Sequence, residues 1–515
     1  MKKSFLEVIM KKSIRILSFA LCALMLCGML AACNGGAGDS TVDLGANGGV
    51  NIGPGGNQGG DHQSTYAPSG NKYDGADFVV LISGKDANTL DIFTYAEENP
   101  TVIDTGIQKK NAAVESDYDI KIAETVLDRG SSNGGATKMS NAISSESLDY
   151  HLAYIESYSV VPLAYDGVLY DLNSMNKEGI NGINLNNEWW DQNANRDLAI
   201  NDLMFFTTGD IDIWDDMQQF VMIFNRTLFA RDIKDYSVDE FYKLVQDGKW
   251  TYDMFYEIAK GYTKDLDGAG VLNNEDQWGM ITWDDTIYSV FSSCGGQVVK
   301  VEEDGSLSLP IFGNELAMDC MRKYTEWTKE NAYNYSRDGG GSKAIKMFTG
   351  DLALFFMGRL QSLDNYRDME SDFGLTPVPK YSEDQTYNVT CSPYHFNFVC
   401  TLSLEEQVDM RAEVIESLAY YSRQYLTPAY REKTLEGQSV RDDGSLETLK
   451  ITADNRIYDI GFYIKPGDIT RELIQLYRLW STDYASMYAG VKSTAEQAVK
   501  SVSDAYRDMI AEWQQ

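Results

Sequence analysis

The apolar and polar positions of the first thirty residues form a short apolar segment behind a basic start. Lys11, Lys12 and Arg15 precede the apolar segment, which runs from Ile16 to Leu30. Basic residues followed by an apolar stretch of this length are typical of a secretory signal. The stretch is short for a transmembrane helix, and small residues close it. Residues 1–32 are therefore predicted to be a signal that is removed, and Met10 offers a second start besides Met1.

Regular apolar patterns resume near residue 77 and predict alternating strands and helices. Residues 77–82 form a short apolar run, typical of a buried parallel strand, and residues 118–122 and 150–155 predict two further strands. Helical patterns cover residues 104–116 and 138–145, between these strands. The order strand, helix, strand, helix, strand indicates an α/β fold with a mostly parallel sheet.

Between the signal and this ordered part lies a segment rich in Gly, Asn and Ser. From Asn34 to about Lys72 it repeats Gly-Gly pairs, and we expect nothing in it to form a core. Such a composition is typical of a flexible tether. Residues 33–73 are therefore assigned to a tether, and the globular part is expected from residue 74.

The net charge limits which molecules the protein can bind, and the cysteine content limits which disulfides it can form. The chain carries a formal net charge of -33, and the predicted signal holds more bases than acids, so the mature chain is more acidic still. Such a surface repels nucleic acid and anionic lipid headgroups. Beyond the signal and Cys33, four cysteines remain (Cys294, Cys320, Cys391 and Cys400), and their three possible pairings are indistinguishable from sequence. Cys391 and Cys400 are the nearest pair, and buried free thiols are the alternative.

The end of the apolar segment resembles a known processing motif. Leu30-Ala31-Ala32-Cys33 resembles the lipobox of bacterial lipoproteins, in which the cysteine receives a diacylglyceryl group and becomes the first mature residue. The resemblance implies a palmitate-type lipid on Cys33. It places the protein on the outer face of the bacterial cytoplasmic membrane, with the lipid as its contact with the bilayer.

A series of short motifs in the globular part resembles the extracellular solute-binding lipoproteins of ABC importers, in the sugar-type, maltose-binding-protein-like group. The motifs fall in the order of that family and span almost all of residues 77–515. They comprise Val102–Asp104, Lys109–Asn111, Val114–Tyr118, Leu148–Tyr150, Gly167–Leu172, Glu188–Asp191, Leu198–Thr207, Phe224–Leu228, Gly248–Thr251, Phe348–Leu354 and Thr376–Lys380, followed by helices from Ala412 onward.

This resemblance implies two α/β lobes of the periplasmic-binding-protein type, connected by crossing strands. The first lobe is expected at residues 74–200 plus about 395–450, and the second at 201–394 plus about 451–515. Crossings are expected near 198–206 and 387–400. Ligand would be held between the lobes, which would close by hinge bending.

The residue inventory favours binding over catalysis. One of the three histidines, His62, lies in the tether, and His151 and His395 do not form an HExxH zinc motif. No GxxxxGK[ST] or GxGxxG motif is present. The chain is therefore not expected to be an enzyme, although the many carboxylates leave a glycosidase pair open as an alternative.

One acidic loop resembles a calcium-binding EF-hand loop. In residues 265–276, Asp265, Asp267, Asn273 and Asp276 occupy liganding positions one, three, nine and twelve, and Val271 would contribute its carbonyl at position seven. Ala269 lacks the fifth ligand, and Asp276 is shorter than the usual Glu. A structural calcium is the predicted metal, a solvated acidic turn is the alternative, and no cofactor is otherwise required.

Aromatic and polar residues of predicted loops are candidates for the ligand site, because an aromatic ring binds the C–H face of a sugar while polar groups bind its hydroxyls. Trp214 with Asp215 lies in a polar loop, and Trp283 with Asp284 follows a predicted strand. Ligands of open α/β sheets bind beyond the carboxyl ends of strands. That rule adds Glu156 and Arg359, and the second expected crossing adds Tyr394. Of the neighbouring Trp189 and Trp190, one is expected to pack between the lobes and one to lie near the cleft, which makes Trp190 a further candidate.

The sequence thus predicts a lipid-anchored, monomeric solute-binding protein that delivers a small ligand, most readily a sugar or oligosaccharide, to an ABC permease. Three alternatives stay open: a surface-anchored glycan-processing enzyme, a binding protein for a peptide or other non-sugar solute, and a partner of a membrane sensor kinase.

Overall fold

The computed structural model describes residues 66–84, 92–127, 134–176, 180–436 and 443–513. The predicted signal at residues 1–32, the lipid site Cys33 and the tether up to residue 65 lie outside the described residues. Among the described residues, no helix combines the length and the apolar character that a membrane span requires.

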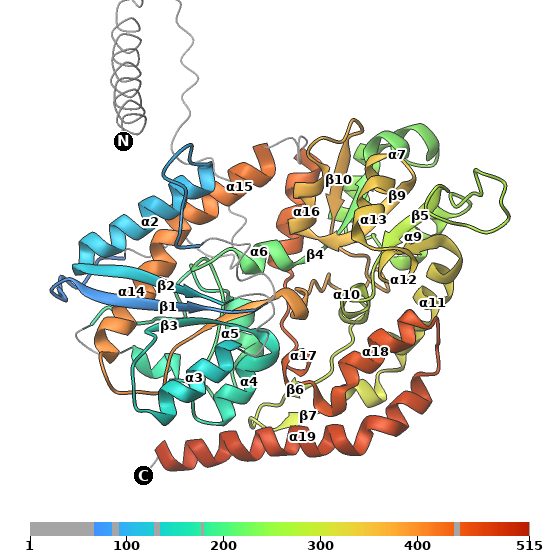
Figure 1. Cartoon of the computed structure of the whole chain (residues 1–515). Coiled ribbons are helices and arrows are strands. Elements are labelled where there is room, and N and C mark those ends of the chain that lie inside the picture. The colour runs from blue at the N-terminus through green and yellow to red at the C-terminus, as the bar shows by residue number, and fades with distance from the viewer. Residues whose placement is uncertain (1–65, 85–91, 128–133, 177–179, 437–442, 514–515) are drawn as a thin grey trace, which may run out of the picture. The chain divides into compact units, whose positions relative to one another are not determined.

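The first lobe is built on a four-stranded sheet with the order β11-β3-β1-β2. Its strands are β1 (Ala76–Ile82), β2 (Ile120–Val126), β3 (Leu152–Glu156) and β11 (Asn397–Cys400). β1 pairs in parallel with β2 and β3, and β11 adds an antiparallel edge. Helices α2 (Val102–Tyr118), α3 (Gly134–Ser144) and α4 (Ser157–Tyr165) follow the three parallel strands, so the predicted alternation is confirmed (Figure 1).

Local signals explain why α2 begins at Val102. The Thr101 hydroxyl accepts from the Asp104 amide at 3.1 Å, and the Asp104 carboxylate accepts from the Thr101 amide at 2.7 Å. This reciprocal capping box satisfies donors that the first helical turn leaves unpaired. Ile107, Val114 and Tyr118 then form the buried face of α2, against which α14 (Val408–Tyr421) and α15 (Thr427–Glu436) pack.

The second lobe contains a five-stranded mixed sheet with the order β10-β4-β9-β5-β8. Its strands are β4 (Phe220–Asn225), β5 (Trp278–Thr282), β8 (Ala332–Asn334), β9 (Ala353–Arg359) and β10 (Phe373–Thr376). β5 is parallel to β8 and β9, whereas β4 is antiparallel to β9 and β10. The helices of this part include α8 (Val238–Gln246), α9 (Tyr252–Ala259), α10 (Thr286–Ser293), α11 (Glu315–Asn331), α13 (Gly341–Thr349) and α16 (Asp443–Asp454).

Two antiparallel segments connect the sheets. Thr207 bridges to Val399 beside the first sheet, and Gln219 bridges to Cys391 where β4 begins. The crossing predicted near 387–400 is therefore present. The first crossing was predicted too early, because residues 200–203 close a tight turn and Met204 bonds back to Asp171 of the first lobe at 2.8 Å. The first crossing instead runs from Thr207 through α6 (Trp214–Gln218) to Gln219. The lobe boundaries at residues 200, 395 and 450 stay a prediction.

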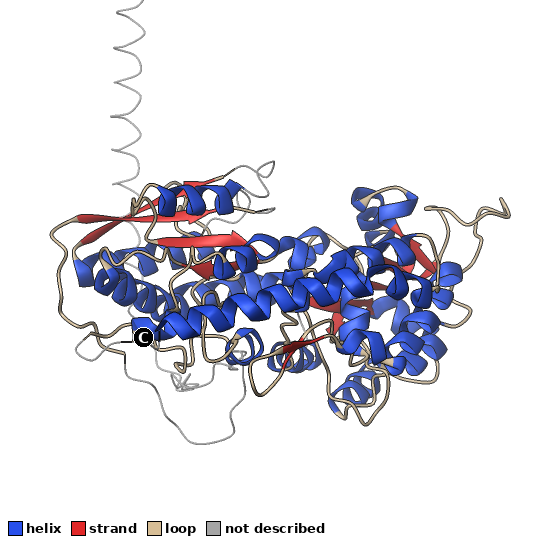
Figure 2. Cartoon of the chain, turned by 90° about the horizontal axis from the view of Figure 1, so that it is seen from below, coloured by secondary structure: helices blue, strands red, loops and turns tan. Residues whose placement is uncertain are grey.

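A third connection lies near the C-terminus. α17 (Gly461–Ile464) packs against α4, and α18 (Ile469–Arg478) packs against α10. Between them, Lys465, Gly467 and Asp468 have left-handed backbones with φ of 51°, 61° and 57°. The long α19 (Tyr484–Trp513), which leads to the C-terminus in Figure 2, contacts both α18 and α4.

The last residues of the expected tether pack onto the first lobe instead of remaining free. The Tyr66 hydroxyl lies 2.6 Å from the Tyr118 hydroxyl, and its ring lies 4.7 Å from that of Tyr420. Tyr73 donates to Glu413 at 2.6 Å. The two tyrosines supply apolar area that the Gly-rich composition concealed, so the predicted tether ends before Tyr66.

One disulfide joins the end of α10 to α11. Cys294 bonds to Cys320, with their Cα atoms 6.4 Å apart, whereas Cys391 and Cys400 are buried free thiols. The disulfide therefore does not join Cys391 and Cys400, the two cysteines that lie nearest to each other in the sequence.

Candidate functional site

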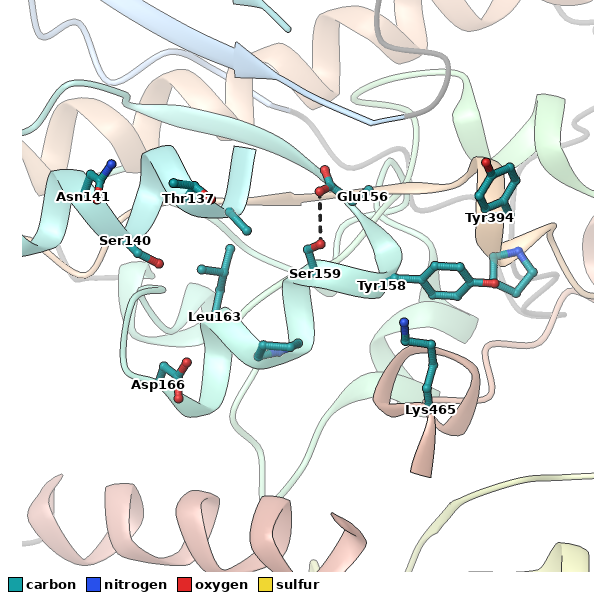
Figure 3. A pocket seen from close by; sticks show the side chains of 13 residues that line it. Thr137, Ser140, Asn141, Glu156, Tyr158, Ser159, Leu163, Asp166, Tyr394 and Lys465 are labelled. Atoms are coloured by element: carbon teal, nitrogen blue, oxygen red, sulfur yellow. Dashed lines mark hydrogen bonds between the residues drawn. The ribbon is translucent and has the colours of Figure 1, made fainter. Parts of the chain in front are cut away.

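The first of two adjoining cavities lies beyond the carboxyl end of β3 and has a volume of about 760 Å³. Glu156, the last residue of β3, faces it with Ser159 and Tyr158 of α4 (Figure 3). Thr137, Ser140 and Asn141 of α3 add polar groups. A strand that ends at a cavity wall is where open α/β sheets bind ligands.

Glu156 is held in place by two hydroxyl donors. Ser83 donates to one carboxylate oxygen at 2.5 Å and Ser159 to the other at 3.0 Å. Burial raises the pKa of Glu156, while these hydrogen bonds oppose the rise. The carboxyl group is thus fixed in orientation and is available as an acceptor for a ligand hydroxyl.

The second cavity has a volume of about 470 Å³, and its lining includes the predicted Trp283 and Asp284 of the second lobe. The Trp283 and His395 rings stack with their centroids 5.9 Å apart and an angle of 24°. The Arg359 guanidinium lies 5.3 Å from the centroid of the Trp283 ring. Arg359 ends β9 and donates to Gln218. This places the predicted Arg359 beside the cavity without lining it.

Acidic groups flank Trp283 in this cavity. Asp284 is buried and accepts from the Arg478 guanidinium at 2.5 Å and from the Asn334 amide at 3.1 Å. Burial and the adjacent Asp284 raise the pKa of Asp285 to about 6, against the opposing effect of Arg359. Asp285 therefore changes its charge near neutral pH.

Tyr158, Tyr394 and Lys465 line both cavities. We call the two cavities together the cleft. Tyr394, which is 45% exposed, comes from the second crossing segment, and Lys465 comes from the connection between α17 and α18. Both lobes and two of their connections thus contribute to one site. Of the predicted ligand residues, Glu156, Trp283, Asp284 and Tyr394 line it.

Three predicted ligand residues are buried elsewhere. Trp214 is only 1% exposed, packs against Tyr154 with ring centroids 5.4 Å apart, and lines neither cavity. The loop that contains Trp214 can be buried because arginines from later in the chain pair with its aspartates. Asp215 pairs with Arg456 at 2.5 Å. Trp190 is buried and its indole N–H donates to Glu416 at 2.9 Å. Contact of these three residues with ligand stays a prediction.

The Arg456 guanidinium is the centre of a buried ionic cluster beside the crossings. It lies 2.5 Å from Asp215, 2.9 Å from Asp216 and 3.5 Å from Asp191. Arg456 and Asp191 are fully buried. Burial raises the pKa of Asp215 and Asp191, and the guanidinium opposes this. The cluster joins α5 (Gln192–Leu198), which Asp191 caps, to α6 of the first crossing.

Several cleft residues were not predicted, chiefly Lys465, Tyr288 and Arg478. Tyr288 lies within an apolar helix, and Arg478 ends an amphipathic one, so neither carries a local signal for binding. A signal for Lys465 was available, because the Pro466-Gly467 pair that follows it breaks the helical pattern and predicts a loop.

The predicted metal loop brings its acids together. One ligand atom of each of Asp265, Asp267 and Asp276 lies within 4.8 Å of the others. Gly270 has a φ of 76°, the left-handed conformation expected at its position. Backbone amides already bind Asp276, from Leu266 at 2.8 Å and from Asn273 at 2.7 Å. Val271 is exposed. Calcium binding to this loop stays a prediction.

Two α/β lobes, crossing segments between them and a cleft lined from both sides define a binding protein. The family model for bacterial extracellular solute-binding proteins matches residues 99–399, and the chain belongs to this family. The family consists of binding proteins that act outside the cytoplasm. No curated protein sequence matches the chain.

Solved structures show the same fold. A cyclo/maltodextrin-binding protein complexed with maltotetraose is 13% identical, with a TM-score of 0.52 over 87% of this chain and 99% of the other. The galacto-N-biose/lacto-N-biose I-binding protein of the ABC transporter from Bifidobacterium longum is 12% identical, with a TM-score of 0.55 over 84% and 99%. An ABC transporter solute-binding protein from Thermotoga lettingae, bound with α-D-tagatose, is 13% identical, with a TM-score of 0.51 over 83% and 100%.

Proposed function

We propose that this protein binds a carbohydrate in the cleft and delivers it to an ABC permease. The observation that carries the proposal is the arrangement around Trp283. An indole supported by the His395 ring lies beside Asp284, Asp285 and the paired Arg478. Aromatic faces bind the C–H surfaces of sugar rings, and carboxylates and guanidinium groups bind hydroxyls. The sugars named for the three similar structures agree with this proposal.

The proposal includes the place of action. A lipid on Cys33 would retain a monomeric protein at the outer face of the cytoplasmic membrane, where a permease receives the ligand. Labelling with a radioactive fatty acid should mark the wild type and not Cys33→Ser. Release of Cys33→Ser into the medium is expected, and an unlabelled wild type would contradict the anchor.

The protein is proposed to bind its ligand without converting it. The glycan-processing alternative predicts new reducing ends when oligosaccharides are incubated with the protein. We expect none above the rate of a heat-inactivated sample.

A ligand screen tests the carbohydrate proposal. The globular part, together with its docked residues from Tyr66, is heated with mono- and oligosaccharides, amino acids and peptides. A ligand that binds only the folded state stabilises it and so raises the melting temperature. At a concentration one hundred times its Kd, the free energy of unfolding rises by about 2.7 kcal/mol. A shift with a peptide and with no sugar would refute the proposal.

A pair of tryptophan variants locates the site. Trp283→Ala should weaken the ligand identified in the screen roughly tenfold or more, because the stacking face is lost. Trp480→Ala is the matched control, since Trp480 follows α18, is half-buried under Arg337, and does not line either cavity. Equal affinities of the two variants would remove Trp283 from the site.

A further inference from the structure

Lys465 occupies a backbone position that directs its side chain into the cleft. It caps α17 with a left-handed φ of 51°, which is uncommon for a residue other than glycine. Its amide donates to Gly461 at 3.0 Å, and its carbonyl accepts from Asp468 at 2.9 Å. Figure 3 shows the ammonium group pointing toward Tyr158, and the nitrogen lies 4.5 Å from the centroid of that ring.

The ammonium group of Lys465 has no carboxylate partner among the described residues. The other charges that line the second cavity are largely paired: Arg478 binds Asp284 at 2.5 Å, and Arg471 binds Asp468 at 3.3 Å. Asp285 has a raised pKa and lies near Arg359. Lys465 therefore contributes a positive charge that protein groups do not neutralise by direct contact.

This charge stands out against the composition of the chain, which has 77 acids and 44 bases. A strongly acidic surface disfavours anions in general. A cation at the junction of two cavities gives an anionic group a local position in which it is stabilised. Ammonium–carboxylate contacts are charge-assisted hydrogen bonds and are stronger than contacts with a neutral hydroxyl.

We infer that the ligand is an acidic saccharide in which one sugar unit carries a carboxylate, and that Lys465 binds this carboxylate where the two cavities meet. The inference rests on the proposed carbohydrate function and narrows its ligand class. Tyr158 lines both cavities and Trp283 lines the second, so each can contact a sugar unit that flanks the carboxylate. The cavities, of about 760 and 470 Å³, fall within the usual range for ligand sites.

Matched neutral and acidic sugars test the inference. Calorimetry compares oligogalacturonates with galactose oligomers of equal length, and glucuronate-containing disaccharides with their glucose counterparts. We expect the acidic member of each pair to bind roughly tenfold or more tightly. This advantage should shrink as salt is raised, because salt screens the charge contact.

Lysine variants assign the preference to this residue. Lys465→Met should abolish the preference for the acidic member, and Lys465→Arg should retain it. Lys500→Met removes one positive charge from exposed α19, where Lys500 pairs with Asp504, and should leave the preference unchanged. Unfolding curves of the unliganded variants show whether each one folds. If Lys465→Met does not fold, the wild-type preference, its salt dependence and Lys465→Arg decide the question.

The outcomes separate the two proposals. Neutral sugars that bind as tightly as their acidic counterparts, or a preference that survives Lys465→Met, would overturn this inference and leave carbohydrate binding intact. Absence of binding to either kind of saccharide would overturn both.

Discussion

Replacing Arg456 with methionine should destabilise the protein strongly, because its guanidinium is the shared ion-pair partner of Asp191, Asp215 and Asp216. Arg456 and Asp191 are fully buried, and the Asp215 and Asp216 side chains are 5% and 13% exposed. Methionine fills a similar volume but leaves these carboxylates without a counter-ion. Breaking a buried ion pair from one side costs about 3–5 kcal/mol.

The loss should depend on pH in a defined direction. Burial already raises the pKa of Asp191 and Asp215 in the folded state, and removal of the guanidinium raises it further. A carboxyl group whose pKa is higher when folded than when unfolded stabilises the fold at low pH, and this contribution is lost as pH rises. The penalty of Arg456→Met should therefore be smaller near pH 5 than near pH 8.

Urea unfolding followed by tryptophan fluorescence measures both effects. Arg507→Met is the matched control, since Arg507 is 67% exposed and pairs with Asp504 on α19. Exposed pairs contribute about 0–1 kcal/mol, so the control should unfold almost like the wild type. A loss below about 1 kcal/mol for Arg456→Met near pH 8 would refute the reasoning, as would a loss that does not vary with pH.

Three further predictions concern other buried or clustered acids. Glu416→Gln should lower the free energy of unfolding by about 2–4 kcal/mol, because two indoles and two asparagines donate to the Glu416 carboxylate. The glutamine amide group would place its own N–H donors against these donors. The exposed Glu432→Gln variant is the control in urea titrations. The affinity for a neutral sugar should fall as pH drops below about 6, because Asp285 gains a proton and no longer accepts as a carboxylate from a sugar hydroxyl. Calorimetry should find this step missing in Asp285→Asn. Calcium should raise the melting temperature, an effect absent in Asp276→Asn; no change on chelation would contradict the metal site.

Most of the first sheet could be predicted from sequence, because β1 and β3 are local apolar runs, β2 alternates at its start, and α2 begins at a local capping box. Glu156 and Trp283 could be predicted as cleft residues on the same basis. Glu156 ends β3 and Trp283 follows β5, and the carboxyl ends of these strands open into the cavities.

Trp214 could not be placed from its own segment. Its neighbours Asp210 and Asp215 suggest an exposed loop, but Arg423 binds Asp210 at 2.7 Å and Arg456 binds Asp215. Both arginines lie more than two hundred residues later in the chain. Ion pairs with residues distant in sequence thus allow a locally polar loop to be buried. This burial cannot be predicted from the residues next to Trp214.

The docking of Tyr66 and Tyr73 on α2 and α14 determines which lobe carries the mechanical connection to whatever precedes it. A pull along the chain from before Tyr66 is transmitted to the first lobe through these aromatic and hydrogen-bonded contacts. Hinge closure is a rotation of one lobe relative to the other. In the proposed anchored protein, hinge closure would therefore move the second lobe, which carries Trp283, relative to the first.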